Sequence, residues 1–339
     1  LGGLLAEGIL FPYDPLFNTD YLQKKEVEAK RRIIHEIMSN LILELPEMSR
    51  ELLIKPEYFM FEMMMRKALI FTPITYSFLN MLRTDLRERN IESVMKGFGR
   101  ALEIVVDEGC IIFHDGYVKI TEDYINAIRK KKLYVRDFFR SIPKGMFRHI
   151  FRVFPKMMHS FVEDQEIYAK HLADEGESAV TPIFKLEDPK GYIFIPTPLG
   201  PVSLSDKITI EDFVRKTVPD GYTLKVDVKK VGGVLNTVYM LRFQREEREE
   251  KIVVKMFKDW YSWKWFPLAL WALGTRGFAV FGKSRLEKEY TINRFLSSNG
   301  VNVPKIIYVS PKERLIFQEF IDGTNLTSII KKMYSPQER

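Results

Sequence analysis

The sequence predicts an α+β fold, in which a mostly helical N-terminal half with one β-hairpin precedes an antiparallel sheet with one helix. Three observations lead to this prediction. Apolar residues recur with a helical period through residues 21–45. Asp115-Gly116 separates two short β-rich runs, which is a strong hairpin signal. From Thr223 onward, the pattern changes from helical to that of successive strands.

The composition is that of a folded protein. Of the 339 residues, 46% are hydrophobic and 29% are charged, which argues against a disordered chain and against a membrane protein. The length suits two or three domains. The net charge of +7 is compatible with a polyanionic partner such as ATP, RNA or DNA, although many proteins without such a partner are equally basic.

The single cysteine, Cys110, excludes an intrachain disulfide and the Cys pairs of a usual zinc site. We therefore expect a reducing, cytoplasmic setting and assign no metal ligand. The apolar stretch Trp260–Phe281 has an uncharged run of only eleven residues, Trp265–Thr275, which is too short for a membrane span. The sequence predicts a buried or partner-facing helical insert there, and no membrane contact.

Residues 1–55 are expected to form a strand, a turn and a long helix that Pro46 ends. The polar face of this helix is predicted to carry its charged residues, Lys24, Lys25, Glu26, Glu28, Lys30, Arg31 and Arg32.

Residues 56–134 are predicted to form several helices, a hairpin and a further helix that starts at Thr121. The expected helices before the hairpin span residues 57–71, 77–87 and 91–108. Gly109 is a good stop signal for the last of them. Helices followed by a two-stranded wing and a helix resemble a winged helix-turn-helix.

The predicted helix 91–108 would be the recognition helix if this region contacted DNA or RNA. It carries Lys96 and Arg100, but also four acidic residues, Glu92, Glu103, Asp107 and Glu108. That is a poor face for phosphates. A packing module is therefore favoured, and nucleic-acid contact stays open as the alternative.

Residues 135–205 are predicted to be a helical connector and a linker. Basic residues alternate with phenylalanines through 130–175, which favours an amphipathic helix over a nucleic-acid surface. The helical period is lost in 172–205, where five prolines accumulate.

Residues 206–339 hold the candidate site. A short helix near 209–217 is followed by strands and turns, with a second helix at 284–298. The first strand ends in Gly232-Gly233, and a charged turn is expected at 245–251. Lys255 interrupts an apolar strand, and a charge there needs a partner or a ligand.

This order of elements resembles the N-lobe of the protein-kinase-like superfamily, in particular the KEOPS-complex kinase, the RIO kinases and the aminoglycoside/choline kinase group. Three motifs carry the resemblance: the turn from Gly232-Gly233 through Asn236 to Tyr239, the segment from Arg285 and Glu289 to Pro304, and the hinge-like segment Gln318–Gly323. About 100 residues are covered.

The resemblance implies a phosphotransferase that binds ATP with Mg²⁺ or Mn²⁺. Lys255 would contact the α- and β-phosphates and pair with Glu289. Glu287 is the alternative partner, because the two glutamates point about 200° apart on a helix and only one can face the site. The nucleotide would also contact Gly232, Gly233, Asn236 and Val238 in the turn and the backbone of Glu319 and Ile321 in the hinge.

The chain begins at Leu1 and ends at Arg339, sixteen residues after Gly323, so we expect an internal fragment that stops before the catalytic loop and the metal ligands of the C-lobe. The first hypothesis is thus a fragment of an atypical ATP-dependent kinase that acts on an unknown protein or RNA-associated substrate. The second is a nucleic-acid-associated binding or regulatory protein with a degenerate kinase lobe, in which Lys255 and Glu289 form a structural ion pair.

The N-terminal strand, turn and long helix also resemble the end of a minimal archaeal nucleotidyltransferase. That resemblance implies a third alternative, a nucleotidyltransferase–kinase fusion whose catalytic carboxylates lie upstream of Leu1.

Overall fold

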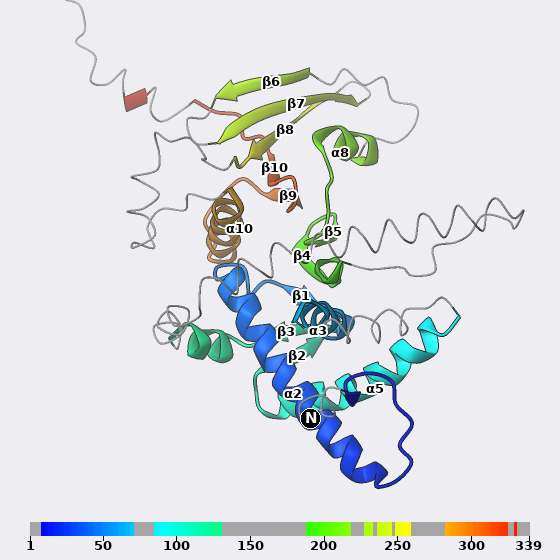
Figure 1. The fold of residues 1–339 in the computed structure, drawn as a ribbon. Helices are drawn as coiled ribbons and strands as arrows, with labels where there is room; N and C mark the ends of the chain where they lie inside the picture. The colour runs from blue at the N-terminus through cyan, green and yellow to red at the C-terminus, as the bar shows by residue number, and fades with distance from the viewer. Residues whose placement is uncertain are drawn as a thin grey trace, which may run out of the picture. The chain divides into compact units, whose positions relative to one another are not determined.

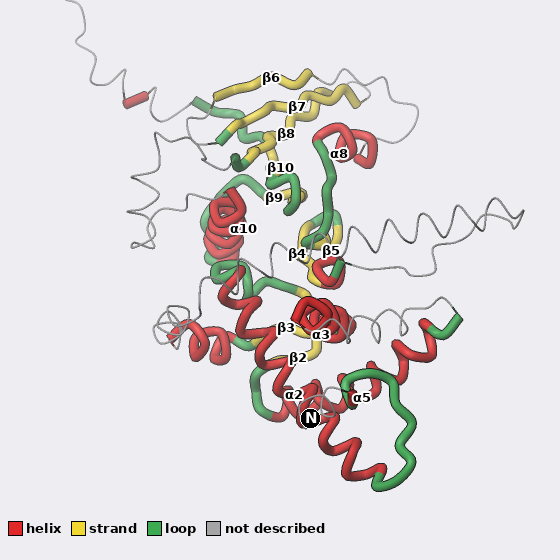
Figure 2. The backbone as a smooth tube through the Cα atoms, in the orientation of Figure 1, coloured by secondary structure: helices red, strands yellow, loops and turns green. Residues whose placement is uncertain are grey.

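The computed structural model describes residues 8–70, 85–130, 188–217, 227–232, 236–245, 248–258, 282–324 and 329–330. The protein is α+β, with helices and two antiparallel sheets (Figures 1 and 2). The chain divides into two compact units: Leu1–Pro196 with Ser203–Ser205, and Thr197–Val202 with Asp206–Arg339. Among the helices of the described ranges, none is long and apolar enough to cross a membrane.

The first unit is built on the helices that the periodicity predicts. They are α2 (Thr19–Glu44), α3 (Glu57–Ile70) and α5 (Arg87–Asp107). The long helix expected in 21–45 is confirmed as α2, whose apolar stripe Ile34, Ile37, Met38, Leu41 and Ile42 is buried. Helix α5 begins four residues earlier than expected and ends before Gly109, whose φ of +70° is the left-handed turn that glycine favours. The expected helix 77–87 lies largely outside the described residues.

The polar face expected for α2 needs a correction. Lys30 is fully buried and Glu26 is 7% exposed, although the sequence places both on the solvent side of the helix. The Lys30 ammonium donates to Glu26 Oε1 at 2.5 Å and to the carbonyl oxygen of Val94 in α5 at 2.8 Å. Gly97 of α5 makes room for this pair, because a Cβ at that position would overlap both side chains.

The Asp115-Gly116 hairpin is confirmed. Strands β2 (Ile111–His114) and β3 (Tyr117–Ile120) pair in the register His114 to Tyr117, and both turn residues have positive φ, 48° and 77°. This is the backbone geometry of a type I′ turn.

The hairpin continues into strands that the sequence does not predict. The sheet has the order β2-β3-β1-β4-β5, with β1 (Leu53–Ile54), β4 (Ile193–Thr197) and β5 (Gly200–Ser203). The prolines made residues 188–205 read as linker, whereas the structure pairs β4 with β1. Pro201 is tolerated because β5 is an edge strand, where a missing N–H breaks no ladder. The connector at 135–187 lies outside the described residues.

The second unit contains a five-stranded antiparallel sheet in the order β6-β7-β8-β10-β9. Its strands are β6 (Asp227–Gly232), β7 (Thr237–Arg245), β8 (Arg248–Met256), β9 (Ile306–Ser310) and β10 (Leu315–Glu319). The charged turn expected at 245–251 is shorter than predicted. The ladder continues to the pair Arg245–Arg248, so only residues 246 and 247, which lie outside the described ranges, connect the strands.

Helix α8 (Ile210–Thr217) contributes to the core on one face of this sheet. Thr209 and Asp212 form a reciprocal cap at its start: Asp212 N–H donates to Thr209 Oγ1 at 3.1 Å, and Thr209 N–H donates to the Asp212 carboxylate at 3.2 Å. Phe213 is 2% exposed and stacks on Phe317 of β10 with 4.0 Å between ring centroids. The remaining buried core includes Leu241, Ile252, Val254 and Leu315.

Candidate functional site

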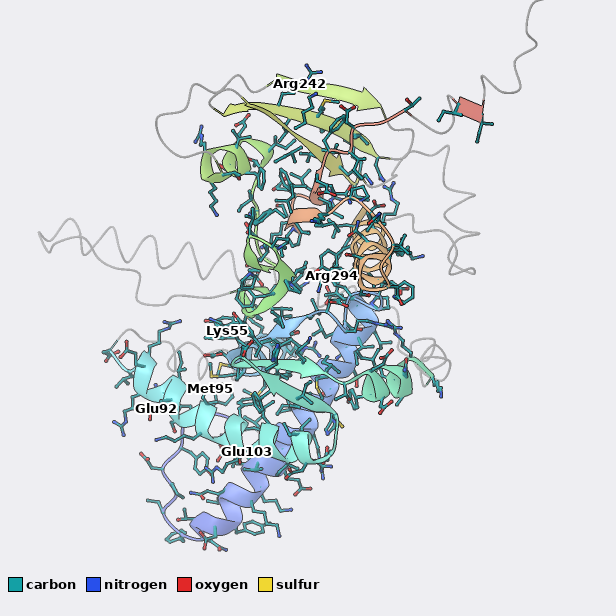
Figure 3. All side chains as sticks on the ribbon, turned by 180° about the vertical axis from the view of Figure 1, so that it is seen from behind. Lys55, Glu92, Met95, Glu103, Arg242 and Arg294 are labelled. Atoms are coloured by element: carbon teal, nitrogen blue, oxygen red, sulfur yellow. The ribbon has the colours of Figure 1, made fainter. Side chains whose placement is uncertain are left out.

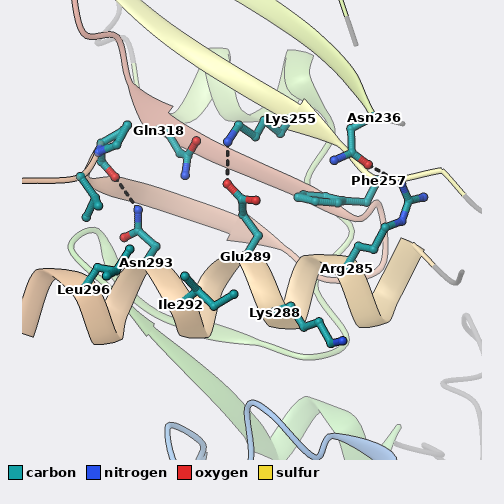
Figure 4. Close-up of a pocket in the computed structure, with 12 residues that line it drawn as sticks. Asn236, Lys255, Phe257, Arg285, Lys288, Glu289, Ile292, Asn293, Leu296 and Gln318 are labelled. Carbon is teal, nitrogen blue, oxygen red and sulfur yellow. Dashed lines mark hydrogen bonds and ion pairs between the residues drawn. The ribbon is translucent and has the colours of Figure 1, made fainter. Parts of the chain in front are cut away.

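The site is a pocket in the second unit, between the sheet and helix α10 (Gly282–Ser298), with a volume of about 380 Å³ (Figure 4). Its described lining comes from β8, β10, α10, the residues just before β7 and just after β8, and the segment that follows α10. These residues are Asn236, Lys255, Phe257, Arg285, Lys288, Glu289, Ile292, Asn293, Leu296, Val303, Pro304 and Gln318. The apolar insert expected at 260–281 lies outside the described residues.

Strand β8 positions Lys255. Neighbouring residues on a strand point to opposite faces of the sheet, and the alternate residues Ile252 and Val254 are buried in the core that contains Phe213. Lys255 therefore projects from the other face, where α10 lies. Within the sheet it is flanked by Val238 of β7 and Ile316 of β10. The central strand β8 thus places the ammonium group of Lys255 in the pocket.

Helix α10 supplies most of the pocket wall with one stripe of side chains. Arg285, Glu289, Ile292 and Leu296 recur at intervals of three and four residues, which places them on the same helix face. The helix begins close to the end of β8. Gly282 packs on the backbone carbonyl of Phe257, and a Cβ there would overlap it. This approach brings Glu289 within reach of Lys255.

Lys255 Nζ donates to Glu289 Oε1 at 2.5 Å (Figure 4). The two side chains are 28% and 35% exposed, so the pair is screened only in part and its charges still face the pocket. The structure selects Glu289 over Glu287 as the partner. Glu287 is 3% exposed and lies on the opposite, buried side of the helix.

Three further hydrogen bonds hold the pocket rim. Arg285 Nη1 donates to the Asn236 side-chain oxygen at 2.7 Å, and Arg285 also donates to the carbonyl of Lys258. At the other end of α10, Asn293 Nδ2 donates to the carbonyl of Pro304 at 2.7 Å. These contacts fix both ends of the helix to neighbouring loops.

The residues predicted from sequence are brought together only in part. Lys255, Glu289 and Asn236 line the pocket, and Val238 is the strand partner of Lys255. Gly232 ends β6 beside a bulge, while Gly233 lies outside the described residues. Glu319 and Ile321 do not line the pocket. The backbone N–H of Glu319 donates to the carbonyl of Lys305 at 3.0 Å, and Ile321 is 58% exposed.

The sequence reasoning did not assign Arg285, Lys288, Asn293 or Gln318 to the site, although signals were present. Arg285 and Asn293 lie four residues on either side of Glu289, so they share its helix face, and Lys288 follows Arg285 by three residues. Gln318 is a polar residue inside an apolar strand, as Lys255 is, and it is only 2% exposed. Once Lys255 or Glu289 is assigned to the site, helix spacing indicates the neighbours on α10, and a polar residue in an apolar strand indicates Gln318.

A second polar cluster lies in the first unit. His35, Glu108 and Cys110 place potential metal-ligand atoms within 4.8 Å of one another. Glu108 is already paired with Arg31 and with His35 Nε2, the latter at 2.8 Å, and the other ring nitrogen of His35 contacts the Tyr124 hydroxyl at 3.0 Å. Burial, helped by Glu108, raises the pKa of the Cys110 thiol, which disfavours the thiolate that a metal needs. The Glu108 carboxylate and both ring nitrogens of His35 are thus already engaged in contacts within the protein.

The exposed side of α5 does not form a cationic surface. Glu92 and Glu103 are exposed on this helix (Figure 3). Lys96 pairs with Glu92 at 3.2 Å, and Arg100 donates to the Gln23 side chain at 3.1 Å. Of these two cations only Lys96 is paired with an acidic residue, because the Gln23 side chain is neutral.

No model of a known protein family matches the chain, and no curated protein matches it significantly in sequence.

Proposed function

We propose that the second unit binds ATP and forms the N-lobe part of the ATP site of an atypical ATP-dependent kinase. The observation that carries this proposal is the Lys255–Glu289 pair, which joins the central strand of an antiparallel sheet to the adjacent helix inside a pocket. A cation that is held by a carboxylate and still faces open space is suited to bind an anionic group. In a kinase, such a pair positions the α- and β-phosphates.

The charge balance of the pocket supports an anionic ligand. Lys255, Arg285 and Lys288 contribute three positive charges, while Glu289 contributes one negative charge. Lining by one sign of charge raises the local concentration of the opposite sign. A nucleoside triphosphate, accompanied by Mg²⁺ or Mn²⁺, is an anionic ligand that suits these positive charges.

The pocket residues do not themselves form a divalent-cation site. Among the described residues of the lining, Glu289 is the one carboxylate, and it is bound to Lys255. Mg²⁺ needs oxygen ligands in octahedral geometry, which this set does not supply. The role we propose for these residues is therefore to bind and orient the nucleotide, in a reducing, cytoplasmic setting. The phosphate acceptor would be a protein or an RNA-associated substrate.

For the first unit we propose a winged helix that positions the acceptor. The element order α2-β1-α3-α5-β2-β3, with β1 next to β3 in the sheet, supports this proposal. The acidic residues Glu92, Glu103 and Asp107 of α5 favour contact with a protein over contact with DNA or RNA, since they repel phosphates.

Nucleotide-dependent thermal stabilisation of the whole chain tests the ATP proposal. A ligand at 100 times its Kd stabilises the folded state by about 2.7 kcal/mol, which corresponds to roughly 5 °C or more in Tm for a unit of this size. We expect ATP with Mg²⁺ or Mn²⁺ to raise the Tm of the wild type and of Lys207→Met, an exposed control in the same unit. Lys255→Met should lose the shift.

Two results would contradict the ATP proposal. One is the absence of a shift at millimolar ATP in the wild type, which favours a binding module with a structural Lys255–Glu289 pair. The other is a full shift in Lys255→Met, which places the nucleotide elsewhere.

A further inference from the structure

We infer that Arg285 is a positioning residue of the pocket: it holds the side-chain oxygen of Asn236 and thereby turns the N–H donors of that amide toward the phosphates of the nucleotide. This inference rests on the proposed ATP site. Arg285 lies near the start of α10, and Asn236 comes just before β7. The two side chains meet where Arg285 Nη1 donates to Asn236 Oδ1 at 2.7 Å (Figure 4).

The chemistry of the two groups decides which end of the Asn236 amide faces Arg285. A guanidinium has N–H donors and no acceptor, so the amide must present its oxygen to Arg285. Its NH₂ group then points the other way. Figure 4 shows this group on the side of the amide that is nearer to Lys255 and Glu289, in the pocket that all four residues line. The N–H donors of Asn236 and the ammonium of Lys255 therefore face the same space.

A second contact holds the Arg285 side chain itself in place. Arg285 Nη2 donates to the backbone carbonyl of Lys258, just after β8. One planar group thus bridges two acceptors from different parts of the sheet. A lysine in place of Arg285 would keep the positive charge but would carry it on one compact ammonium with a flexible stem. It would not fix the Asn236 amide in the same way.

Arg285 also contributes its charge to the pocket lining, and this charge attracts anions whatever Asn236 does. A test has to separate the charge from the orientation of the amide. Arg285→Lys makes this separation because it keeps the charge and removes the planar fork. Asn236→Ala removes the amide that the fork is inferred to orient.

The experiment is a calorimetric titration of the whole chain with tripolyphosphate and with ATP, each in the presence of Mg²⁺. We expect Asn236→Ala to weaken both ligands about tenfold, the effect of one hydrogen bond to a charged group. Arg285→Lys should weaken both about three- to tenfold, because the Asn236 side chain must then be ordered by the ligand. The double variant should bind no more weakly than Asn236→Ala alone, since Arg285 acts through Asn236.

Nuclear magnetic resonance of the ¹⁵N-labelled chain gives a second readout that a purely structural role would not change. The side-chain NH₂ signals of Asn236 are identified by their absence in Asn236→Ala. In the wild type, tripolyphosphate should shift these signals. In Arg285→Lys at saturating tripolyphosphate, the shift should be smaller, because the amide is no longer held in one orientation.

The outcomes separate this inference from the ATP proposal. If Lys255→Met weakens both ligands while Arg285→Lys binds them as the wild type does, the ATP site stands and the inference is wrong. Additive losses in the double variant would also overturn it, since Arg285 would then act independently of Asn236. A loss of ATP binding without a loss of tripolyphosphate binding would place Asn236 on another part of the nucleotide. If the wild type binds neither ligand, both proposals fall.

Discussion

Replacing Lys30 by Met tests the buried ion pair of the first unit most directly. The Lys30 side chain is fully buried and bonds Glu26 Oε1 and the Val94 carbonyl. Removing one partner of a buried pair costs about 3–5 kcal/mol, because the remaining charge is left without compensation. The hydroxyl of Tyr13 still donates to Glu26 Oε2 at 3.1 Å, so we expect the lower end of this range, about 3 kcal/mol.

Urea unfolding followed by circular dichroism at 222 nm measures this cost, since α2, α3 and α5 contribute much of the helical signal. With a slope of about 2–3 kcal/mol per molar urea, a loss of about 3 kcal/mol lowers the midpoint by roughly 1–1.5 M. The double variant Lys30→Met/Glu26→Gln should recover most of the loss, because no buried charge remains. Lys25→Met is the matched control on the same helix, because its pair with Glu28 is exposed and screened by solvent, so we expect no measurable loss.

The reasoning fails if Lys30→Met lies within the error of the wild type. It also fails if Lys30→Met and Glu26→Gln are additive, since side chains in direct contact must show a coupling energy.

Three further predictions follow from the same structure. Gly97→Ala should lower the free energy of unfolding by about 1–3 kcal/mol, despite the better helix propensity of alanine, because its Cβ overlaps Glu26 and Lys30; a stabilised variant in the same urea assay would contradict the packing. Phe213→Ala should cost about 3–5 kcal/mol by emptying the space against Phe317, which hydrogen exchange of the β10 amides can measure; unchanged protection would refute it. Burial, reinforced by Glu26, raises the pKa of Tyr13 to about 12. The folded state thus holds this proton more tightly than the unfolded state, so the stability it contributes is present below pH 10 and is lost as the pH rises through 12; absorbance at 295 nm should show a late-titrating tyrosine that Tyr13→Phe removes.

Some residues of the candidate site could be identified from sequence patterns, and others could not. Lys255 could be found from sequence, because a lone charge in an apolar strand stands out against its neighbours. The helical period places Glu287 and Glu289 on different faces but does not say which face meets the sheet, so the choice of Glu289 came from the resemblance. Gln318 was visible as a polar residue in a strand, but its place in the pocket wall depends on which face of the sheet meets α10.

The sequence alone determined the local elements of this protein: the α2 and α5 periods, the Asp115-Gly116 turn and the alternation of the second sheet. These are encoded over spans of a few residues, where backbone preference and side-chain spacing act directly. Only the tertiary structure decided that Lys30 is buried, because this depends on the space that Gly97 leaves in another helix. It also decided that β4 joins β1 and that Glu289 meets Lys255, since both contacts depend on long-range packing.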